Sequence, residues 1–186
     1  MGAHSHFLWM DLFSRENSAK RNLINVLKEN VLFKTLSLRE LKYLANLVYE
    51  RVYQPNEPIF QQNDRGLGMY LIAKGKVAIK SPTPEGEVLV TTLQEGNFFG
   101  EIALVDPDNM RSASAVAAER CMIIGFFKPD LMEILERKPT MGVKILFQLS
   151  TILGRRLLET TERIAQMTRS PIHSSLRRGE RLEKTS

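Results

Sequence analysis

The stretch Gly96-Asn-Phe-Phe-Gly-Glu-Ile-Ala-Leu-Val-Asp-Pro-Asp-Asn-Met-Arg-Ser-Ala-Ser-Ala-Val-Ala-Ala118 carries most of the information on fold and function in this chain. Within it, Gly100 precedes one short apolar turn, Glu101 to Leu104, which is too short to form an independent helix. The free backbone N–H groups at the start of such a turn attract an anion. A glycine there lets a ligand approach the backbone closely. The stretch therefore predicts an anion site at Gly100.

Arg111 follows this turn and is surrounded by small residues of β type, from Ser112 to Val116. An arginine in such a context needs an anionic partner, because burying an unpaired charge is costly. Two partners are consistent with the residues. Arg111 pairs with Glu101 inside the protein, or it binds a phosphate bidentately while Glu101 accepts a hydrogen bond from a sugar hydroxyl. Residue chemistry alone leaves these two alternatives open.

A family resemblance favours the phosphate. The run Phe99-Gly-Glu-Ile-Ala-Leu104, a loop, and then Arg111-Ser-Ala113 resembles the phosphate-binding cassette of the cyclic-nucleotide-binding family. That family includes bacterial cAMP receptor proteins and protein kinase A regulatory subunits. Upstream, Gly68-Met-Tyr-Leu-Ile72 with Gly75-Lys-Val77 is similar to the family's hairpin, and the resemblance extends from about Val31 to Met167. Members that have lost the ligand typically replace the glutamate or the arginine, and this chain keeps both.

The resemblance implies a role for each residue of the cassette. Arg111 and Ser112 hold the cyclic phosphate, together with backbone N–H groups near Ile102 and Ala103, and Glu101 accepts from the ribose 2′-hydroxyl. The expected ligand-binding residues on this segment are Gly100, Glu101, Ile102, Ala103, Arg111, Ser112 and Ala113.

Three further candidates come from the same resemblance and lie near the end of the chain. Thr160 and Thr161 fall where bacterial cAMP receptors contact the adenine, one of them from the partner subunit, and Arg156 lies in a run similar to the corresponding helix. The alternatives are that Thr160 fills a dimer seam and that Arg156 is a solvated helix charge. By this analogy Thr160 favours cAMP as the ligand, with cGMP and cyclic di-GMP as the other possibilities.

The fold class follows from a change in pattern after Arg51. Pro55 and Pro58 stop any helix, and turn signals then separate short β-rich segments. These segments are 59–61, 69–72, 77–79, 88–93, 114–118 and 122–126. Such strands predict an antiparallel roll or barrel. With the resemblance, the expected fold is mainly β with flanking helices: an antiparallel, jelly-roll-like β-roll (a double-stranded β-helix) between N-terminal helices and a long C-terminal helix.

Helical patterns flank these strands. Apolar spacing predicts a helix over 17–30, a capping box of Ser37 and Glu40 begins a second helix, and Pro129 opens a third that Pro139 ends. Residues 141–168 predict a helix of about 42 Å, longer than a small roll can cover. We therefore expect its far half to pair with another copy, giving a parallel helix-pair homodimer. The alternative is a helix that folds back over its own roll.

These patterns divide the chain into a helical extension over 1–30, a ligand-binding domain over 31–168 and a basic tail over 169–186 that we expect to be disordered. The tail supplies +3 of the net charge of +5, so the charge does not indicate nucleic-acid binding. About 18 residues follow Thr168, too few for a winged-helix domain, and we expect no DNA binding. The output is expected to pass to a separate protein partner.

Several other functions are not expected from this composition. No apolar run reaches the roughly 18 to 20 residues that span a bilayer, and the N-terminus is unlike a signal peptide, so we expect a cytoplasmic location. A single cysteine, Cys121, excludes an internal disulfide and a cysteine-based zinc cluster, and His4, His6 and His173 are scattered near the ends. With no nucleophile or paired-carboxylate motif, we expect no enzyme, no catalytic residue, no metal and no cofactor. The open alternative is a ligand-free interaction scaffold with a vestigial cassette.

Overall fold

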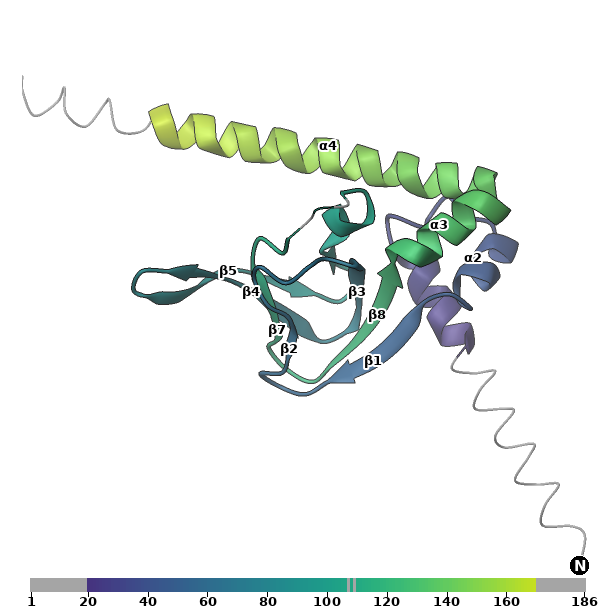
Figure 1. Ribbon diagram of the computed structural model, residues 1–186, viewed down its shortest axis with the longest axis horizontal. Coiled ribbons are helices and arrows are strands. Elements are labelled where there is room, and N and C mark those ends of the chain that lie inside the picture. Colours follow the sequence, from purple (N-terminus) through teal and green to yellow (C-terminus); the bar gives the residue numbers. More distant parts are fainter. Residues whose placement is uncertain (1–19, 107, 109, 170–186) are drawn as a thin grey trace, which may run out of the picture. The chain divides into compact units, whose positions relative to one another are not determined.

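The computed structural model describes residues 20–106, 108 and 110–169. Two four-stranded antiparallel sheets form the roll, with strand orders β1-β8-β3-β6 and β2-β7-β4-β5 (Figure 1). Their strands are β1 Tyr49–Tyr53, β2 Pro58–Phe60, β3 Gly68–Lys74, β4 Lys76–Thr83, β5 Gly86–Gln94, β6 Phe98–Phe99, β7 Ser114–Ala117 and β8 Cys121–Phe127. The predicted fold class, a mainly β roll with flanking helices, is confirmed.

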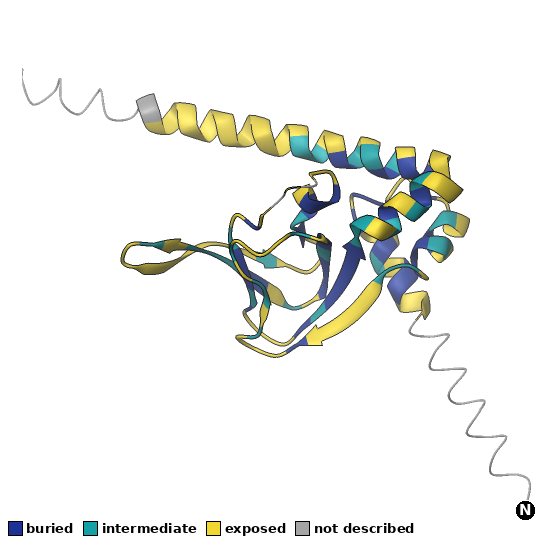
Figure 2. Cartoon of the chain, viewed as in Figure 1, coloured by how far each residue is buried: buried dark blue, intermediate teal, exposed yellow. Residues whose placement is uncertain are grey.

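The core of the roll forms where the two sheets face each other. Five of the seven residues of β8 are buried, and its neighbour β3 is nearly as apolar, which is typical of central strands. At the other extreme, β5 lies at the edge of its sheet and is exposed along almost all of its length (Figure 2). A cluster of buried side chains from both sheets fills the interior: Tyr53, Ile72, Val77, Phe99, Ala115, Ala117, Cys121 and Ile123.

All six predicted strands are present, and two strands were not predicted. β1 (Tyr49–Tyr53) has one buried residue among five, so its sequence shows no regular apolar alternation. β6 (Phe98–Phe99) has only two residues, and it is recognised by its pairing with Tyr70 and Leu71 of β3. Both strands are defined by long-range pairing rather than by local pattern.

The helices before the roll follow their sequence signals. Residues 20–29 are helical, and three apolar residues predicted on one face of that helix, Leu23, Ile24 and Leu27, are buried. The second helix is α2, Leu38–Leu44. Its capping box is present, since the Glu40 amide donates to Ser37 Oγ at 3.3 Å and the Ser37 amide donates to Glu40 Oε2 at 2.7 Å.

Two helices follow the roll, α3 (Lys128–Arg137) and α4 (Pro139–Arg169). α3 ends where predicted, but α4 begins two residues earlier than expected, because Pro139 occupies its first position, where a missing N–H costs nothing. The 31 residues of α4 give a helix of about 46 Å. Within the described ranges no helix combines the length and apolarity needed to cross a membrane.

The chain divides into two compact units, one up to Ile145 and one from Leu146 onward. The roll, α2, α3 and the first two turns of α4 belong to the first unit, and the rest of α4 belongs to the second. The predictions made for residues 1–19 and 170–186, including the three histidines and most of the basic tail, lie outside the described residues. The predicted domain boundaries therefore stay a prediction.

Candidate functional site

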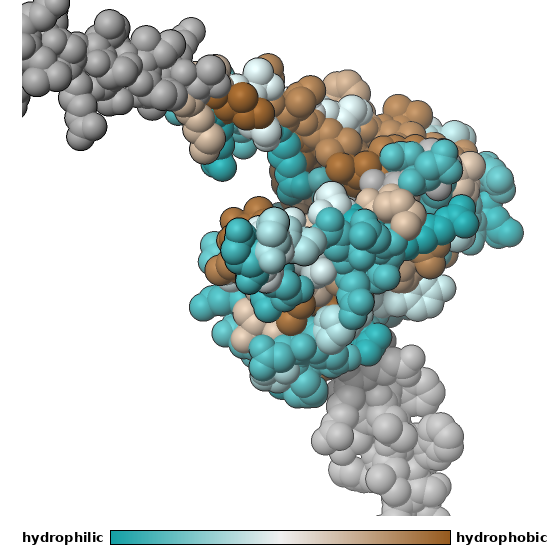
Figure 3. Space-filling model, turned by 60° about the vertical axis from the view of Figure 1, so that its left-hand side comes forward, coloured by the Kyte–Doolittle hydropathy of each residue, from teal (hydrophilic) through white to brown (hydrophobic). Residues whose placement is uncertain are grey.

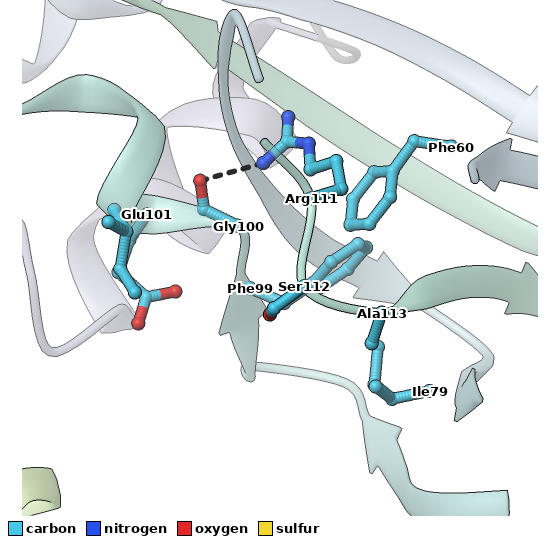
Figure 4. A pocket seen from close by; sticks show the side chains of 9 residues that line it. Phe60, Ile79, Phe99, Gly100, Glu101, Arg111, Ser112 and Ala113 are labelled. Carbon is cyan, nitrogen blue, oxygen red and sulfur yellow. Dashed lines mark hydrogen bonds between the residues drawn. The ribbon is translucent and has the colours of Figure 1, made fainter. Parts of the chain in front are cut away.

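The predicted cassette lines a cavity of about 180 Å³ on the roll (Figure 4). Six of the predicted residues meet there: Gly100, Glu101, Ile102, Arg111, Ser112 and Ala113. Three apolar side chains, Phe60, Ile79 and Phe99, complete the lining. Residues that are distant in the sequence are thus brought to one place by the pairing of the strands.

Gly100 connects β6 to the short 3₁₀ helix η1, Glu101–Leu104, and its backbone requires glycine. It adopts φ 72° and ψ 16°, the left-handed region that other residues avoid. In addition, a Cβ atom at this position would collide with Nη1 of Arg111. The close approach of the guanidinium to the backbone therefore depends on the missing side chain.

Arg111 is only 5% exposed and is held by backbone carbonyl groups. Its Nη1 donates to the Gly100 carbonyl at 2.9 Å (Figure 4). Its Nη2 donates to the Gly68 carbonyl at 2.7 Å. The guanidinium also lies 4.2 Å from the centroid of the Phe60 ring and 5.6 Å from that of Tyr70. These contacts fix the side chain in place, but all of them are made by neutral groups.

The charge of Arg111 is consequently poorly compensated. Its Nε is buried and has no hydrogen-bond partner among the described residues. Burial lowers the pKa of the guanidinium below its ordinary value, and Tyr70, Asp64 and Glu101 offset part of this effect. A desolvated cation with an unpartnered N–H attracts an anion strongly.

Glu101 is also 5% exposed, yet it is not the group that holds Arg111. In Figure 4 its carboxylate extends away from the guanidinium, on the other side of Gly100. Its effect on the pKa of Arg111 is the smallest among the three groups that offset burial. Residue chemistry left open whether Arg111 pairs with Glu101. In the structure, the acceptors of Arg111 are instead the backbone carbonyl groups of Gly100 and Gly68.

The remaining cassette residues differ in accessibility. Ser112 and Ile102 are exposed at the cavity, with Ile102 at 47%, and Ala113 is half-buried. Ala103 is fully buried beneath the lining, and its amide donates to the Gly100 carbonyl at 3.3 Å. This bond lies within the 3₁₀ turn, and the phosphate contact predicted for the backbone near Ile102 and Ala103 stays a prediction.

The contribution of Phe60 and Ile79 to the apolar lining of the site was not predicted. Phe60 and Ile79 lie on separate strands, β2 and β4, and Tyr70 on β3 stacks on Phe99 at a centroid distance of 5.6 Å. A strand's apolar alternation could have assigned Phe60 to the inner face. However, register shifts next to Phe60 and Ile79 interrupt the alternation, so only the folded structure identifies them as lining residues.

The three candidates near the chain end lie on the part of α4 that belongs to the second unit. Thr160, Thr161 and Arg156 are all exposed there. The hydroxyl of Thr160 donates to the Arg156 carbonyl at 2.7 Å, and that of Thr161 donates to the Leu157 carbonyl at 2.9 Å. Their role in base contact stays a prediction. In the part of the chain that the structure describes, no cluster of His, Cys, Asp and Glu could hold a metal ion.

Comparisons with known proteins point to one family. Residues 50–138 match the family profile described as a cyclic nucleotide-binding domain. The chain is 34% identical over 134 residues to the Cyclic AMP receptor protein of Thermus thermophilus, covering 72% of this chain and 60% of that protein. It is 32% identical over 117 residues to the cAMP-dependent protein kinase type II regulatory subunit of Drosophila melanogaster, covering 62% of this chain and 31% of that subunit. The chain thus spans 60% or less of the length of these two relatives.

Solved structures show the same fold. The Thermus thermophilus catabolite activator protein aligns with a TM-score of 0.66 and 31% identity, over 75% of this chain and 63% of that one. A cyclic nucleotide-binding domain from Methylobacillus flagellatus aligns with a TM-score of 0.69 and 24% identity, over 81% of this chain and 84% of that one. The second likeness concerns the fold alone.

Proposed function

Because this chain contains a domain of the cyclic nucleotide-binding family, whose relatives are regulatory proteins, we propose that it is a non-catalytic sensor that binds cAMP at the cassette cavity. One observation carries the proposal. Arg111 is buried at the cavity wall, with carbonyl acceptors for its terminal nitrogens and an unpartnered Nε. A single anionic group beside Nε would compensate both the charge and the free donor.

The phosphate contact can form without displacing the bonds that hold Arg111. A guanidinium has five N–H donors, and the Gly100 and Gly68 carbonyls use two of them. Nε and the neighbouring terminal nitrogen then offer a side-on fork to two oxygens of a cyclic phosphate. The exposed hydroxyl of Ser112 lies at the same cavity and supplies a further donor.

The sugar and the base are assigned to different residues. Glu101 accepts from the ribose 2′-hydroxyl, as the family resemblance implies, since its carboxylate lines the cavity on the far side of Gly100. The cavity of about 180 Å³ is smaller than the roughly 300 Å³ at which ligand pockets begin, so the roll holds only part of a nucleotide. The base therefore needs contacts from outside this lining, and we assign them to Thr160 and Thr161.

The hydroxyl geometry of these threonines supports adenine over guanine. Each hydroxyl has one hydrogen, and both hydrogens are donated to helix carbonyls, at Arg156 and Leu157. What remains on Thr160 and Thr161 is acceptor capacity. Adenine offers an exocyclic amine that donates, whereas guanine offers a carbonyl at that position, so these threonines favour cAMP. We assign Arg156, one turn before Thr160, as a further contact to the ligand.

The signal is proposed to leave through α4 in a homodimer. Residues 154–167 are exposed, and large apolar side chains gather along this helix (Figure 3). Those of the far half are Leu157, Leu158, Ile164 and Met167, each at least 59% exposed. Pairing with a second copy would cover them, and ligand contact at Thr160 would then reorient the helix by differential affinity for two arrangements.

Thermal unfolding with cAMP, cGMP and cyclic di-GMP tests the proposal. At a hundred times its dissociation constant, a ligand stabilises by about 2.7 kcal/mol, which raises the midpoint by about 5 to 11 °C for a chain of this size. We expect this shift with cAMP for the native chain and no shift for Arg111→Ala. If no nucleotide at millimolar concentration moves the native midpoint, the two carbonyl contacts suffice for Arg111, and the domain is a ligand-free scaffold.

A further inference from the structure

A second polar cavity, of about 380 Å³, is lined by residues of α2 and of the link between α3 and α4. Figure 1 shows these helices close to one another. Three cations line the cavity, Arg39 and Lys42 from α2 and Lys138 from the link. The other lining residues are Glu40, Tyr43, Asn46 and Met141. We call this cavity the basic corner. All of it belongs to the first compact unit, and it shares no lining residue with the cassette.

The carboxylates near the basic corner are already committed to other groups. Glu40 accepts from Lys144 Nζ at 2.9 and 3.0 Å and from the Ser37 amide at 2.7 Å. Glu133 accepts from the Tyr43 hydroxyl at 3.0 Å and lies 3.7 Å from Arg137 Nε. Neither of these carboxylates neutralises the three cations of the cavity.

Within the described part of the chain, the three cations have no acidic partner. Among the described residues, no carboxylate lies within ion-pair distance of Arg39, Lys42 or Lys138. Lys138 has its ammonium 5.8 Å from the centroid of the Tyr43 ring. A fourth cation, Lys20, reaches Asn46 Oδ1 at 2.7 Å and adds positive charge at the rim. Positive charge that lines a concave surface attracts anions more strongly than the same charges on a convex one.

We propose that the basic corner binds an acidic segment of a partner protein, with carboxylates that pair separately with Arg39, Lys42 and Lys138. The three cations are exposed and come from two elements, so they are suited to several spaced carboxylates. A single small phosphate would instead call for buried donors that converge on one point, as at Arg111 in the cassette. Charge complementarity therefore favours an acidic protein segment.

The position of the basic corner makes it a place where a partner can act on α4. Glu40 lines the cavity and also holds Lys144, which lies in the second turn of α4. A carboxylate that arrives from a partner competes with Glu40 for Lys144. Binding at the basic corner therefore changes the contacts of Lys144 at the start of α4, whether or not the cassette binds a nucleotide.

The test measures the affinity of a fluorescein-labelled hexaglutamate peptide for the full chain by fluorescence anisotropy, at two salt concentrations. We expect the triple variant Arg39→Gln/Lys42→Gln/Lys138→Gln to weaken binding at least about tenfold. The matched control is Lys74→Gln/Lys76→Gln/Arg120→Gln, which removes the same charges from exposed positions at the β3–β4 end of the roll. The control should change the affinity by less than about twofold.

Three results would overturn the proposal. Equal losses in both triple variants would indicate non-specific attraction, and no binding of hexaglutamate to the native chain would exclude an acidic peptide. Binding of pyrophosphate or of phosphatidylserine vesicles, but not hexaglutamate, with loss only in the corner triple would assign the cavity to phosphate groups instead. Unchanged thermal midpoints show that the variants fold. Arg111→Ala should bind hexaglutamate as the native chain does, so failure here is distinguishable from failure of the nucleotide proposal.

Discussion

The cassette and the far half of α4 differ in what they bury and what they expose: the cassette buries a charge, and the helix exposes apolar side chains. In the cassette, the charge of Arg111 is buried at 5% exposure, and its hydrogen-bond acceptors are neutral carbonyl groups. In the far half of α4, residues 154–167 are exposed, and their large apolar side chains are each at least 59% exposed. One region buries a charge among neutral groups, and the other exposes large apolar side chains to solvent.

This contrast indicates what each region binds. A desolvated cation gains most from an anion that reaches its free N–H, whereas an apolar helix face gains most from a second apolar surface. The two regions should therefore respond differently to substitution. The predictions below test whether the two regions differ as the structure indicates, and they are ordered by the size of the expected effect.

The largest effect is expected from Arg111→Lys. Lysine keeps the charge but has neither the Nε–H nor the planar fork that stacks on Phe60. We expect cAMP affinity to fall about 10- to 100-fold, as measured by isothermal titration calorimetry. Arg51→Lys is the matched control, because Arg51 also lies over an aromatic ring, that of Tyr53, at 4.4 Å. A loss of less than threefold at Arg111 would contradict the fork geometry.

Two glycine substitutions should have opposite signs. Gly100→Ala forces a left-handed φ of 72° on alanine and places Cβ against Arg111, so we expect unfolding free energy to fall by about 1 to 3 kcal/mol. Gly154→Ala lies in α4 with no neighbouring atom within 4 Å of its Cβ, and should raise helix stability by about 0.5 to 1 kcal/mol. Denaturant unfolding followed by circular dichroism measures both. Effects of the same sign would mean that the cassette backbone does not require glycine at position 100.

The apolar face of α4 is tested by Leu157→Glu combined with Ile164→Glu. Both side chains are exposed, at 68% and 59%, so the fold of one chain should be unaffected. If α4 forms the dimer seam, the dissociation constant of the dimer should rise at least about tenfold, because a glutamate is expensive to bury without a partner. Sedimentation equilibrium measures this change. Glu162→Ala on the same helix is the control, and a native chain that is monomeric throughout would reject the seam.

A smaller effect is expected from Thr160→Val. The substitution removes the acceptor lone pairs that we assign to adenine, so cAMP affinity should fall about 3- to 5-fold while cGMP affinity stays the same. Thr151→Val is the matched control, since its hydroxyl donates in the same way to the Phe147 carbonyl at 2.8 Å, about two and a half turns earlier. Equal effects of Thr160→Val on both nucleotides would remove the proposed base selectivity.

The smallest effect concerns the base of α4. Burial raises the pKa of Glu40, but hydrogen bonds from Lys144 and Ser37 outweigh it and hold the pKa below its ordinary value of 4.5. A depressed carboxyl pKa stabilises the fold above the unfolded value, and this contribution is lost as the pH falls through the folded value. Glu40→Gln should thus cost about 0.5 kcal/mol at pH 7, with the difference shrinking as the pH falls below 4.5. A difference that does not depend on pH would assign the cost to packing instead.

Much of this molecule could be predicted locally from the sequence. The capping box of Ser37 and Glu40, the short turn after Gly100 and the six predicted strands all depend on residues within a few positions of one another. The membership of six cassette residues in one cavity was also predicted, but through the family resemblance and not through spacing alone.

The rest was decided by contacts between distant segments. Arg111 donates to the Gly68 carbonyl, 43 positions earlier, and no local pattern assigns a backbone carbonyl as the partner of an arginine. Phe60 and Ile79 reach the cavity because register shifts set which face of β2 and β4 they occupy. The sequence by itself therefore determined which residues carry the charge and which turn presents it. Only the tertiary structure decided that this charge is buried against neutral acceptors, because desolvation depends on everything that packs around a group.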